Sequence, residues 1–197
     1  KTLAVSSQKQ LNQALKTVKG KNAVITVKAG KNVKITIPKG TYKVTIRVVG
    51  KKAAVVNNGT VKEIVVNSKG TVAIKNNGTI KKVTVQNAKS VSFSGNCKKA
   101  VPVVVNAEDV SMILAAPAKI TAKKDVNIVI KKGAEKSSIT CTKNAQAQVD
   151  NQTKKAISVK IADGTTLKVE SGESCTITPK GKKEDTSGED KTDGKDQ

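Results

Sequence analysis

The sequence has few aromatic residues, a single arginine and no histidine. Tyr42 and Phe93 are its only aromatic side chains, Arg47 is its only arginine, and tryptophan is absent. The core must therefore be aliphatic. Base readout favours arginine and single-strand binding favours aromatic platforms, so we expect no specific nucleic-acid partner.

Long apolar runs and paired cysteines are missing too. No stretch reaches the ~18 apolar residues that a membrane-spanning helix needs. Three cysteines, Cys97, Cys141 and Cys175, lack CxxC or CxH spacing, which argues against a disulfide framework or a zinc site. We expect Cys141 and Cys175 to pack as small apolar groups. No phosphate-binding glycine loop is present, and we expect no cofactor and no metal.

Positive charge is what the chain has in excess. Lysine and arginine total 37 against 15 acidic residues, a net charge of +22. Such a field favours polyanions such as teichoic acid, acidic polysaccharide, nucleic acid or an anionic membrane surface. The alternative is that lysines only keep exposed strand edges soluble.

A repeat indicates the architecture. The segment 57–66 (NNGTVKEIVV) returns nineteen positions later as 76–85 (NNGTIKKVTV). Two alternating apolar runs and a glycine corner in a repeat of this length predict a solenoid. We expect Asn58-Gly59 and Asn77-Gly78 to form corners with positive φ; the alternative for Asn-Gly-Thr is a glycosylation sequon.

Alternation of period two continues through the chain and predicts parallel strands in two interleaved sets. The first set comprises 25–27, 44–46, 64–66, 83–85, 103–105, 120–122, 139–141, 159–161 and 175–177. The second comprises 33–37, 54–56, 72–74, 91–93, 110–114, 126–130, 145–149 and 167–169. A third, shorter side passes through Val61 and Ile80. The prediction is an all-β parallel β-helix of about nine coils over residues 21–178.

The two ends differ from this pattern. Residues 1–20 contain an amphipathic stripe, Leu11, Ala14, Leu15 and Val18, after a capping Ser6 or Ser7, which predicts an N-terminal capping helix. Residues 179–197 lack Val, Ile, Leu and aromatic residues, so we expect a disordered charged tail, either a linker or a frayed terminus. Because the chain starts at Lys1, we expect a processed product whose export signal is out of view.

The segments 5–15 (VSSQKQLNQAL), 25–27 (ITV) and 35–42 (ITIPKGTY) resemble the capping helix and first coils of pectate-lyase-like right-handed parallel β-helix proteins. Lysine- and asparagine-rich versions occur in secreted or surface proteins of Gram-positive bacteria. The resemblance implies a single-stranded right-handed β-helix in a secreted or cell-wall location. It also implies cleavage of acidic polysaccharide by clustered acids, often with calcium.

The sequence offers few acids for such chemistry. Glycoside cleavage needs two carboxyl groups roughly 5 to 9.5 Å apart. The nearest candidates are Glu108, Asp109 and Asp125, which we interpret as solvated turns, like Asp163 and the Glu170/Glu173 pair. We assign no catalytic residue; a degenerate polysaccharide lyase or glycoside hydrolase is the alternative function.

Two surfaces remain as candidates. The outward middle positions of the first strand set form a threonine-rich row, which suits ice binding, protein docking or simple β-propensity: Thr26, Thr45, Val65, Thr84, Val104, Thr121, Thr140, Lys160 and Thr176. Paired lysines at coil edges would form one vertical cationic seam: Lys51, Lys52, Lys81, Lys82, Lys98, Lys99, Lys123, Lys124, Lys131, Lys132, Lys154 and Lys155.

The sequence thus predicts a non-catalytic, lysine-rich β-solenoid module of a secreted or cell-surface protein. It would serve as a rigid spacer or adhesive element and would hold anionic cell-wall polymer or acidic polysaccharide. The oligomeric state stays open, with a monomer favoured.

Overall fold

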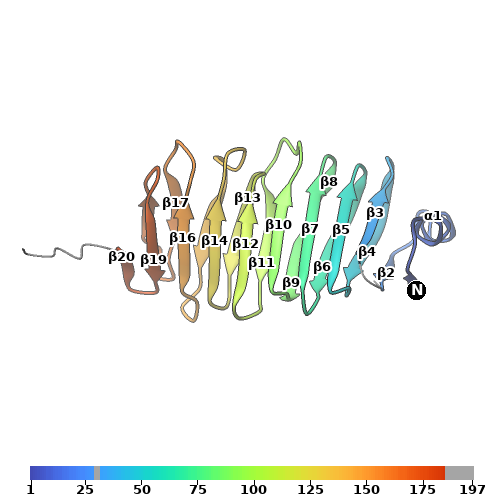
Figure 1. The fold of residues 1–197 in the computed structure, drawn as a ribbon, viewed down its shortest axis with the longest axis horizontal. Coiled ribbons are helices and arrows are strands. Elements are labelled where there is room, and N and C mark those ends of the chain that lie inside the picture. The colour runs from blue at the N-terminus through green and yellow to red at the C-terminus, as the bar shows by residue number, and fades with distance from the viewer. Residues whose placement is uncertain (29–31, 185–197) are drawn as a thin grey trace, which may run out of the picture.

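Two β-sheets enclose the core, and each coil contributes one strand to either sheet (Figure 1). The computed structural model describes residues 1–28 and 32–184. Its one described helix is α1 (Gln8–Thr17). Sheet A contains β1 (Thr2–Val5), β2 (Ala23–Val27), β4 (Thr41–Val48), β6 (Thr60–Asn67), β8 (Thr79–Ile80), β9 (Val83–Asn87), β11 (Val101–Val105), β13 (Ala118–Ala122), β15 (Ser138–Cys141), β17 (Ile157–Lys160) and β18 (Thr166–Val169). Sheet B contains β3 (Val33–Ile37), β5 (Lys52–Asn57), β7 (Thr71–Asn76), β10 (Ser90–Ser94), β12 (Val110–Leu114), β14 (Val126–Ile130), β16 (Ala147–Asn151), β19 (Ser174–Thr178) and β20 (Gly181–Glu184).

The fold is a right-handed parallel β-helix of about 8 turns with a helix at its N-terminal end, as the sequence predicts. Strands of each sheet pair in parallel register with their equivalents one coil away, for example Ile64 with Val83 and Val83 with Val103. The count is one below the expected nine because the chain changes direction before a last coil is complete. No helix in the described residues has the length and hydropathy to cross a membrane.

Alternation within each strand fills the core. In β2 and β14 every second residue is buried, and Ile25 and Ile130 are completely inaccessible. Cys141 and Cys175 are also completely buried, which confirms that they act as packing residues, and no disulfide joins any of the three cysteines, all of which the structure describes. Each inward side chain packs on its equivalents above and below, so the core is continuous along the solenoid axis.

Helix α1 covers the N-terminal end of the stack. The Ser7 hydroxyl caps it by accepting a hydrogen bond from the Gln10 N–H, and Leu11 and Leu15 are buried. The Gln8 amide also pairs with the open edge of β3: its Nε2 donates to the Thr36 carbonyl (2.8 Å), and its Oε1 accepts from the Thr36 N–H (2.7 Å). A side-chain amide thus takes the place of a further strand at an otherwise open edge.

The Asn-Gly corners form, but not for the expected reason. Asn58, Gly59, Asn77 and Gly78 are not among the described residues with positive φ. A Cβ at Gly78 would lie 2.1 Å from the Gly59 carbonyl oxygen of the previous coil. Glycine is therefore required by close stacking of corners, not by left-handed backbone.

The predicted third side is present only as a short ladder within sheet A, not as a separate sheet. Val61 and Ile80 pair with each other in β6 and β8, which belong to sheet A. A register shift between Tyr42 and Thr45 separates this short ladder from the rest of the sheet.

The parallel pairing predicted for the last two strands is wrong. Strand β18 lies in sheet A, antiparallel to β17, and β19 lies in sheet B, antiparallel to β16. A tight turn reverses the chain: Gly164 has φ +90, and the Asp163 carboxylate accepts from the Thr165 N–H. Alternation is the same in parallel and antiparallel strands, so the sequence pattern could not reveal the reversal.

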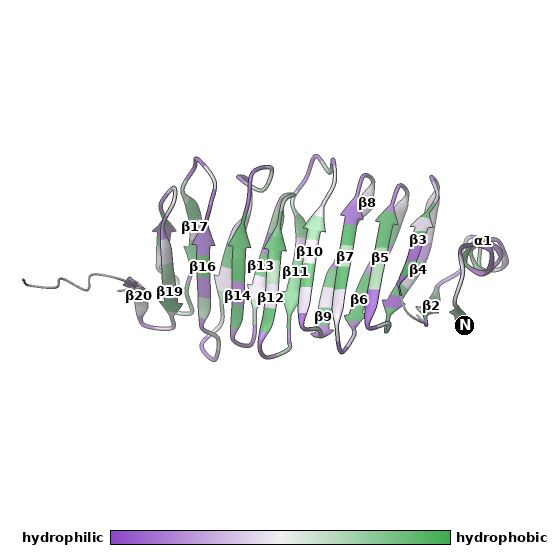
Figure 2. Ribbon diagram, in the orientation of Figure 1, coloured by the Kyte–Doolittle hydropathy of each residue, from purple (hydrophilic) through white to green (hydrophobic). Residues whose placement is uncertain are grey.

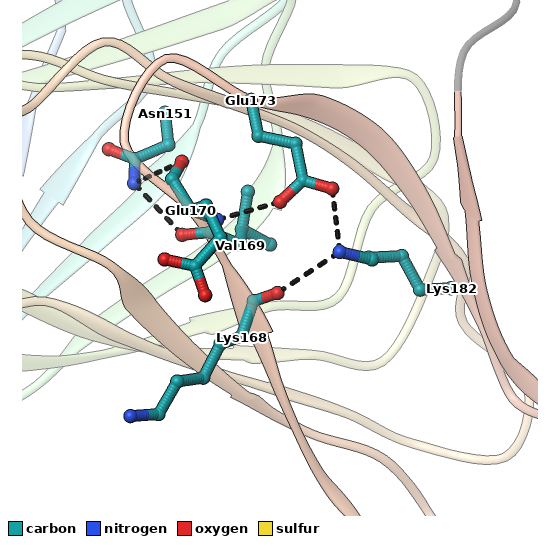
Figure 3. Close-up of polar contacts among 6 residues, drawn as sticks. All are labelled: Asn151, Lys168, Val169, Glu170, Glu173 and Lys182. Carbon is teal, nitrogen blue, oxygen red and sulfur yellow. Dashed lines mark hydrogen bonds and ion pairs between the residues drawn. The ribbon is translucent and has the colours of Figure 1, made fainter.

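A network of polar contacts holds this reversed C-terminal cap (Figure 3). The buried Asn151 amide donates to the carbonyls of Val169 and Glu170, both at 3.0 Å. One Glu173 carboxylate oxygen accepts from the Glu170 N–H (2.7 Å), and the other pairs with Lys182 Nζ (2.6 Å). Lys182 lies on β20, so the tail expected from residue 179 begins instead with a paired strand; residues 185–197 lie outside the described part.

Candidate functional site

The two edges of the solenoid differ in charge. The turns from sheet B to sheet A form the edge at the top of Figure 1, here called the upper edge; those from sheet A to sheet B as far as β16 form the lower edge. After the reversal at Gly164, turn 170–173 lies again at the upper edge, where the Ser171 hydroxyl donates to the Thr153 carbonyl (2.7 Å). The upper-edge turns, with the β8–β9 connection, carry three acids, Glu135, Glu170 and Glu173, and these lysines: Lys39, Lys81, Lys82, Lys98, Lys99, Lys131, Lys132, Lys136, Lys154 and Lys155. The lower-edge turns contain Glu108, Asp109 and Asp125 as well as lysines. Lysines thus outnumber acids along the upper edge by ten to three.

A groove of about 970 Å³ lies in this upper edge, between turns 95–98 and 152–155. Its cationic lining residues are Lys98, Lys132, Lys136, Lys154 and Lys155. None of these five lysines forms an ion pair among the residues that the structure describes. We call this cavity the upper groove.

Unequal turn lengths produce the upper groove. Six residues connect β10 to β11 and seven connect β14 to β15, but only three, 115–117, connect β12 to β13. Figure 1 shows the long turns standing above the strand ends. The short turn forms the floor, where Ala116 is completely buried and Ala115 and Pro117 line the cavity.

Buried polar side chains fix the walls. The Asn151 amide donates to the Lys155 carbonyl (2.8 Å), and the Thr153 hydroxyl donates to Asn151 Oδ1 (2.8 Å). In the neighbouring turn 131–137, the Ser137 hydroxyl accepts from the Ala118 N–H (3.0 Å). The backbone that carries the lysines is therefore held in place, while the lysine side chains project from it.

Glu135 is the one carboxylate in the upper groove. Both of its oxygens accept from the Gly133 N–H, at 3.1 and 3.0 Å. That hydrogen bond, followed by its own backbone N–H and more weakly by Lys155 and Lys132, lowers the pKa of Glu135. Glu135 is therefore ionised at neutral pH and offsets one of the five positive charges.

A second cavity, of about 580 Å³, continues along the upper edge on the other side of turn 95–100. Its cationic lining residues are Lys81, Lys98 and Lys99. The half-buried Cys97 lines both cavities and packs against the core, so it anchors the turn between them. Burial raises the pKa of the Cys97 thiol.

The twelve lysines predicted to form one seam are divided between the two edges. Lys51, Lys52, Lys123 and Lys124 lie at the lower edge, where Lys124 pairs with Glu108 (3.6 Å). The other eight lie at the upper edge, and Lys98, Lys132, Lys154 and Lys155 line the upper groove. The single seam is therefore wrong, because each coil has two turns that face opposite ways. The search for adjacent lysines missed Lys136, because no second lysine stands next to it in the sequence. Only its position in a long turn could have indicated it.

The threonine row is also changed. The register pairs Thr26 with Arg47 and Arg47 with Val65, so Thr45 leaves the row, and Thr176 lies in sheet B. The observed row on sheet A is Ala4, Thr26, Arg47, Val65, Thr84, Val104, Thr121, Thr140, Lys160 and Thr166. Threonine is thus too interrupted to form a regular strip.

The acidic candidates lie in lower-edge turns. Glu108 and Asp109 share the turn before β12, where Asp109 has φ +55, and the Glu108 side chain is 71% exposed. Asp125, one coil further, accepts from the Gln146 N–H (2.9 Å). Within the described residues, no three His, Cys, Asp or Glu side chains are grouped to hold a metal.

Comparisons with known proteins add no name to this geometry: no family model, curated protein or solved structure matches the chain. The β-solenoid fold is established by the structure alone.

Proposed function

We propose that the chain is a non-catalytic β-solenoid module of a secreted or cell-surface protein, most similar to pectate-lyase-like β-helices of bacterial surface proteins. It acts as a rigid spacer or adhesive element, and its upper groove binds a linear anionic polymer. Anionic cell-wall polymer and acidic polysaccharide are the two sources of that polymer.

The observation that carries this proposal is the concentration of unpaired lysines in one groove. Five lysines and one carboxylate line the upper groove, and the lysines of the adjoining cavity extend the positive strip across further coils. Neighbouring coils repeat at roughly 4.8 Å, so the strip presents cations at intervals along the solenoid axis. Cations repeated along this axis suit a polymer with repeated carboxylates or phosphates, to which lysine binds as a point charge.

The spacer role rests on the core. Parallel pairing continues from β1 to β17, and about eight turns at roughly 4.8 Å give a rod of about 38 Å. Each coil contacts its neighbours through a continuous apolar core, which makes the solenoid resist bending.

Two variants with equal charge loss test the binding. The upper-edge variant replaces Lys98, Lys132, Lys154 and Lys155 by glutamine; the control replaces Lys51, Lys52, Lys123 and Lys124 at the lower edge. Retention on immobilised polygalacturonate and on purified teichoic acid is measured at increasing salt. We expect the upper-edge variant to elute at much lower salt, and the control to elute close to the parent protein.

If both variants lose retention on the polymer equally, net charge and not the upper groove is what binds it. Retention that ignores salt would remove the electrostatic basis altogether. The same polygalacturonate samples are read for unsaturated products, whose formation would replace this proposal by the lyase alternative.

A further inference from the structure

The outward face of sheet B carries little charge, although lysine is abundant elsewhere. The outward residues of β7, β10, β12 and β14 are uncharged except Lys75, at the upper end of β7: Thr71, Ala73, Ser90, Ser92, Ser94, Ser111, Ile113, Asn127 and Val129. Figure 2 shows strong purple mainly in the turns and at the two ends of the solenoid, and green to white along the middle strands. We call these nine residues the neutral face.

One row through the neutral face ends in opposite charges. The register aligns Lys34, Ala54, Ala73, Ser92, Ile113, Val129 and Asp150 across seven consecutive strands of sheet B. Ser92 is the central residue, with three strands on each side. The cation and the anion therefore lie at equal distances from Ser92.

We propose that the neutral face is the interface between two copies of this chain. A two-fold axis at Ser92, running parallel to the strands, relates the two copies. Such an axis reverses the row, so that Lys34 of one copy faces Asp150 of the other, twice per dimer. Ala73 then faces Ile113, Ala54 faces Val129, and Ser92 faces its own equivalent. The row is self-complementary in charge, as an interface between identical subunits requires.

The neighbouring row is compatible with the same axis. It aligns Lys52, Thr71, Ser90, Ser111, Asn127 and Gln148, and the axis places Lys52 opposite Asn127 and Thr71 opposite Ser111. No like charges meet in either row. An axis along the solenoid would instead place Lys34 opposite Lys34, so the charges select one orientation.

The net charge of the chain explains why two copies would associate through the neutral face. At +22, two copies repel each other over lysine-rich surfaces, and the neutral face is where they approach with least repulsion. Six inter-strand steps by five residues give roughly 29 × 17 Å, or about 500 Å² per copy. A total of about 1,000 Å² is at the low end for specific interfaces and predicts a weak, reversible dimer.

Sedimentation velocity of the full chain, from micromolar to millimolar concentration under reducing conditions, tests the proposal. We expect a concentration-dependent dimer that the variant Ser92→Lys weakens by at least about tenfold, because two ammonium groups would meet at the axis. The matched control is Thr121→Lys at an outward position of sheet A, which leaves association unchanged. Circular dichroism and melting temperature establish that both variants are folded.

Charge reversal tests the orientation. Lys34→Asp alone and Asp150→Lys alone each place like charges together at both ends of the interface and should weaken the dimer. The double variant restores both pairs and should regain most of the affinity. A monomer at every concentration, a dimer insensitive to Ser92→Lys, or a double variant as weak as the single ones would overturn the proposal. The upper groove lies on another surface, so polymer binding can succeed or fail independently.

Discussion

The side-chain amide of Asn57 donates a hydrogen bond to the side-chain oxygen of Asn76 in the next coil, with 2.9 Å between Nδ2 and Oδ1. Both side chains are completely buried at a corner of the stack. The Asn57 amide also donates to the Gly59 carbonyl (2.9 Å), and its oxygen accepts from the Gly59 N–H (3.2 Å). One asparagine thus satisfies the backbone of its own corner and ties it to the next coil.

Replacing Asn57 by alanine should destabilise the protein by about 3 kcal/mol, since it leaves buried polar groups without partners and creates a cavity. Urea denaturation followed by circular dichroism measures the change. The control is Asn77→Ala, because Asn77 is exposed at the equivalent corner and its bond to Asn58 lies at the surface. A loss from Asn57→Ala no greater than that of the control would contradict this role.

Gly78→Ala should cost about 3 kcal/mol, because the added Cβ would lie 2.1 Å from the Gly59 carbonyl oxygen and must push two coils apart. Gly164→Ala is the contrasting variant. Its Cβ would meet nothing within 4 Å, but its φ of +90 imposes about 1 kcal/mol of backbone strain. Thermal melts of both variants should rank Gly78→Ala as the more damaging change; the reverse order would refute the stacking explanation.

The Glu173–Lys182 pair should make the C-terminal cap sensitive to acid. The hydrogen bond from Lys182 lowers the pKa of Glu173 below its ordinary 4.5. A lowered pKa contributes stability that is complete above the ordinary value and is lost as pH falls through the folded-state pKa. Glu173→Gln should therefore lower the free energy of unfolding at pH 7 by about 1 kcal/mol. Below the folded-state pKa of Glu173 the substitution should have no measurable effect.

The measurement is a set of melting curves of the parent and Glu173→Gln, from pH 7 down to below the folded-state pKa of Glu173. Glu170→Gln serves as the control, since the Glu170 side chain makes no ion pair in the described structure. A parent-to-variant difference that stays constant with pH would show that ionisation of Glu173 does not stabilise the cap.

The three thiols should react at very different rates. Cys97 is partly exposed, whereas Cys141 and Cys175 are completely buried, and burial raises the pKa of Cys141 to about 11. A colorimetric thiol reagent should modify Cys97 alone in the native protein, faster as pH rises because burial also raises the pKa of its thiol. Complete unfolding should make the thiols of Cys141 and Cys175 accessible to the reagent. Prompt reaction of all three native thiols would mean that the core opens readily, and Cys97→Ser identifies which thiol responds first.

The amino-acid sequence alone specifies the coils. A repeat of nineteen residues with alternating Val and Ile specifies strands that stack in parallel, because only stacking buries one face of every strand. It also determined the N-terminal helix, whose Ser7 cap and Leu11–Leu15 stripe are local signals, and the packing role of Cys141 and Cys175.

Which surfaces form depends on contacts that exist only in the folded chain. The offset between β2 and β4 placed Arg47, not Thr45, beside Thr26, and the reversal at Gly164 moved the last strands to the opposite sheets. The short turn 115–117 became a floor only because longer turns flank it in space. Alternation fixes which side chains point inward, but it is blind to strand direction and register, and these depend on contacts between residues far apart in the chain.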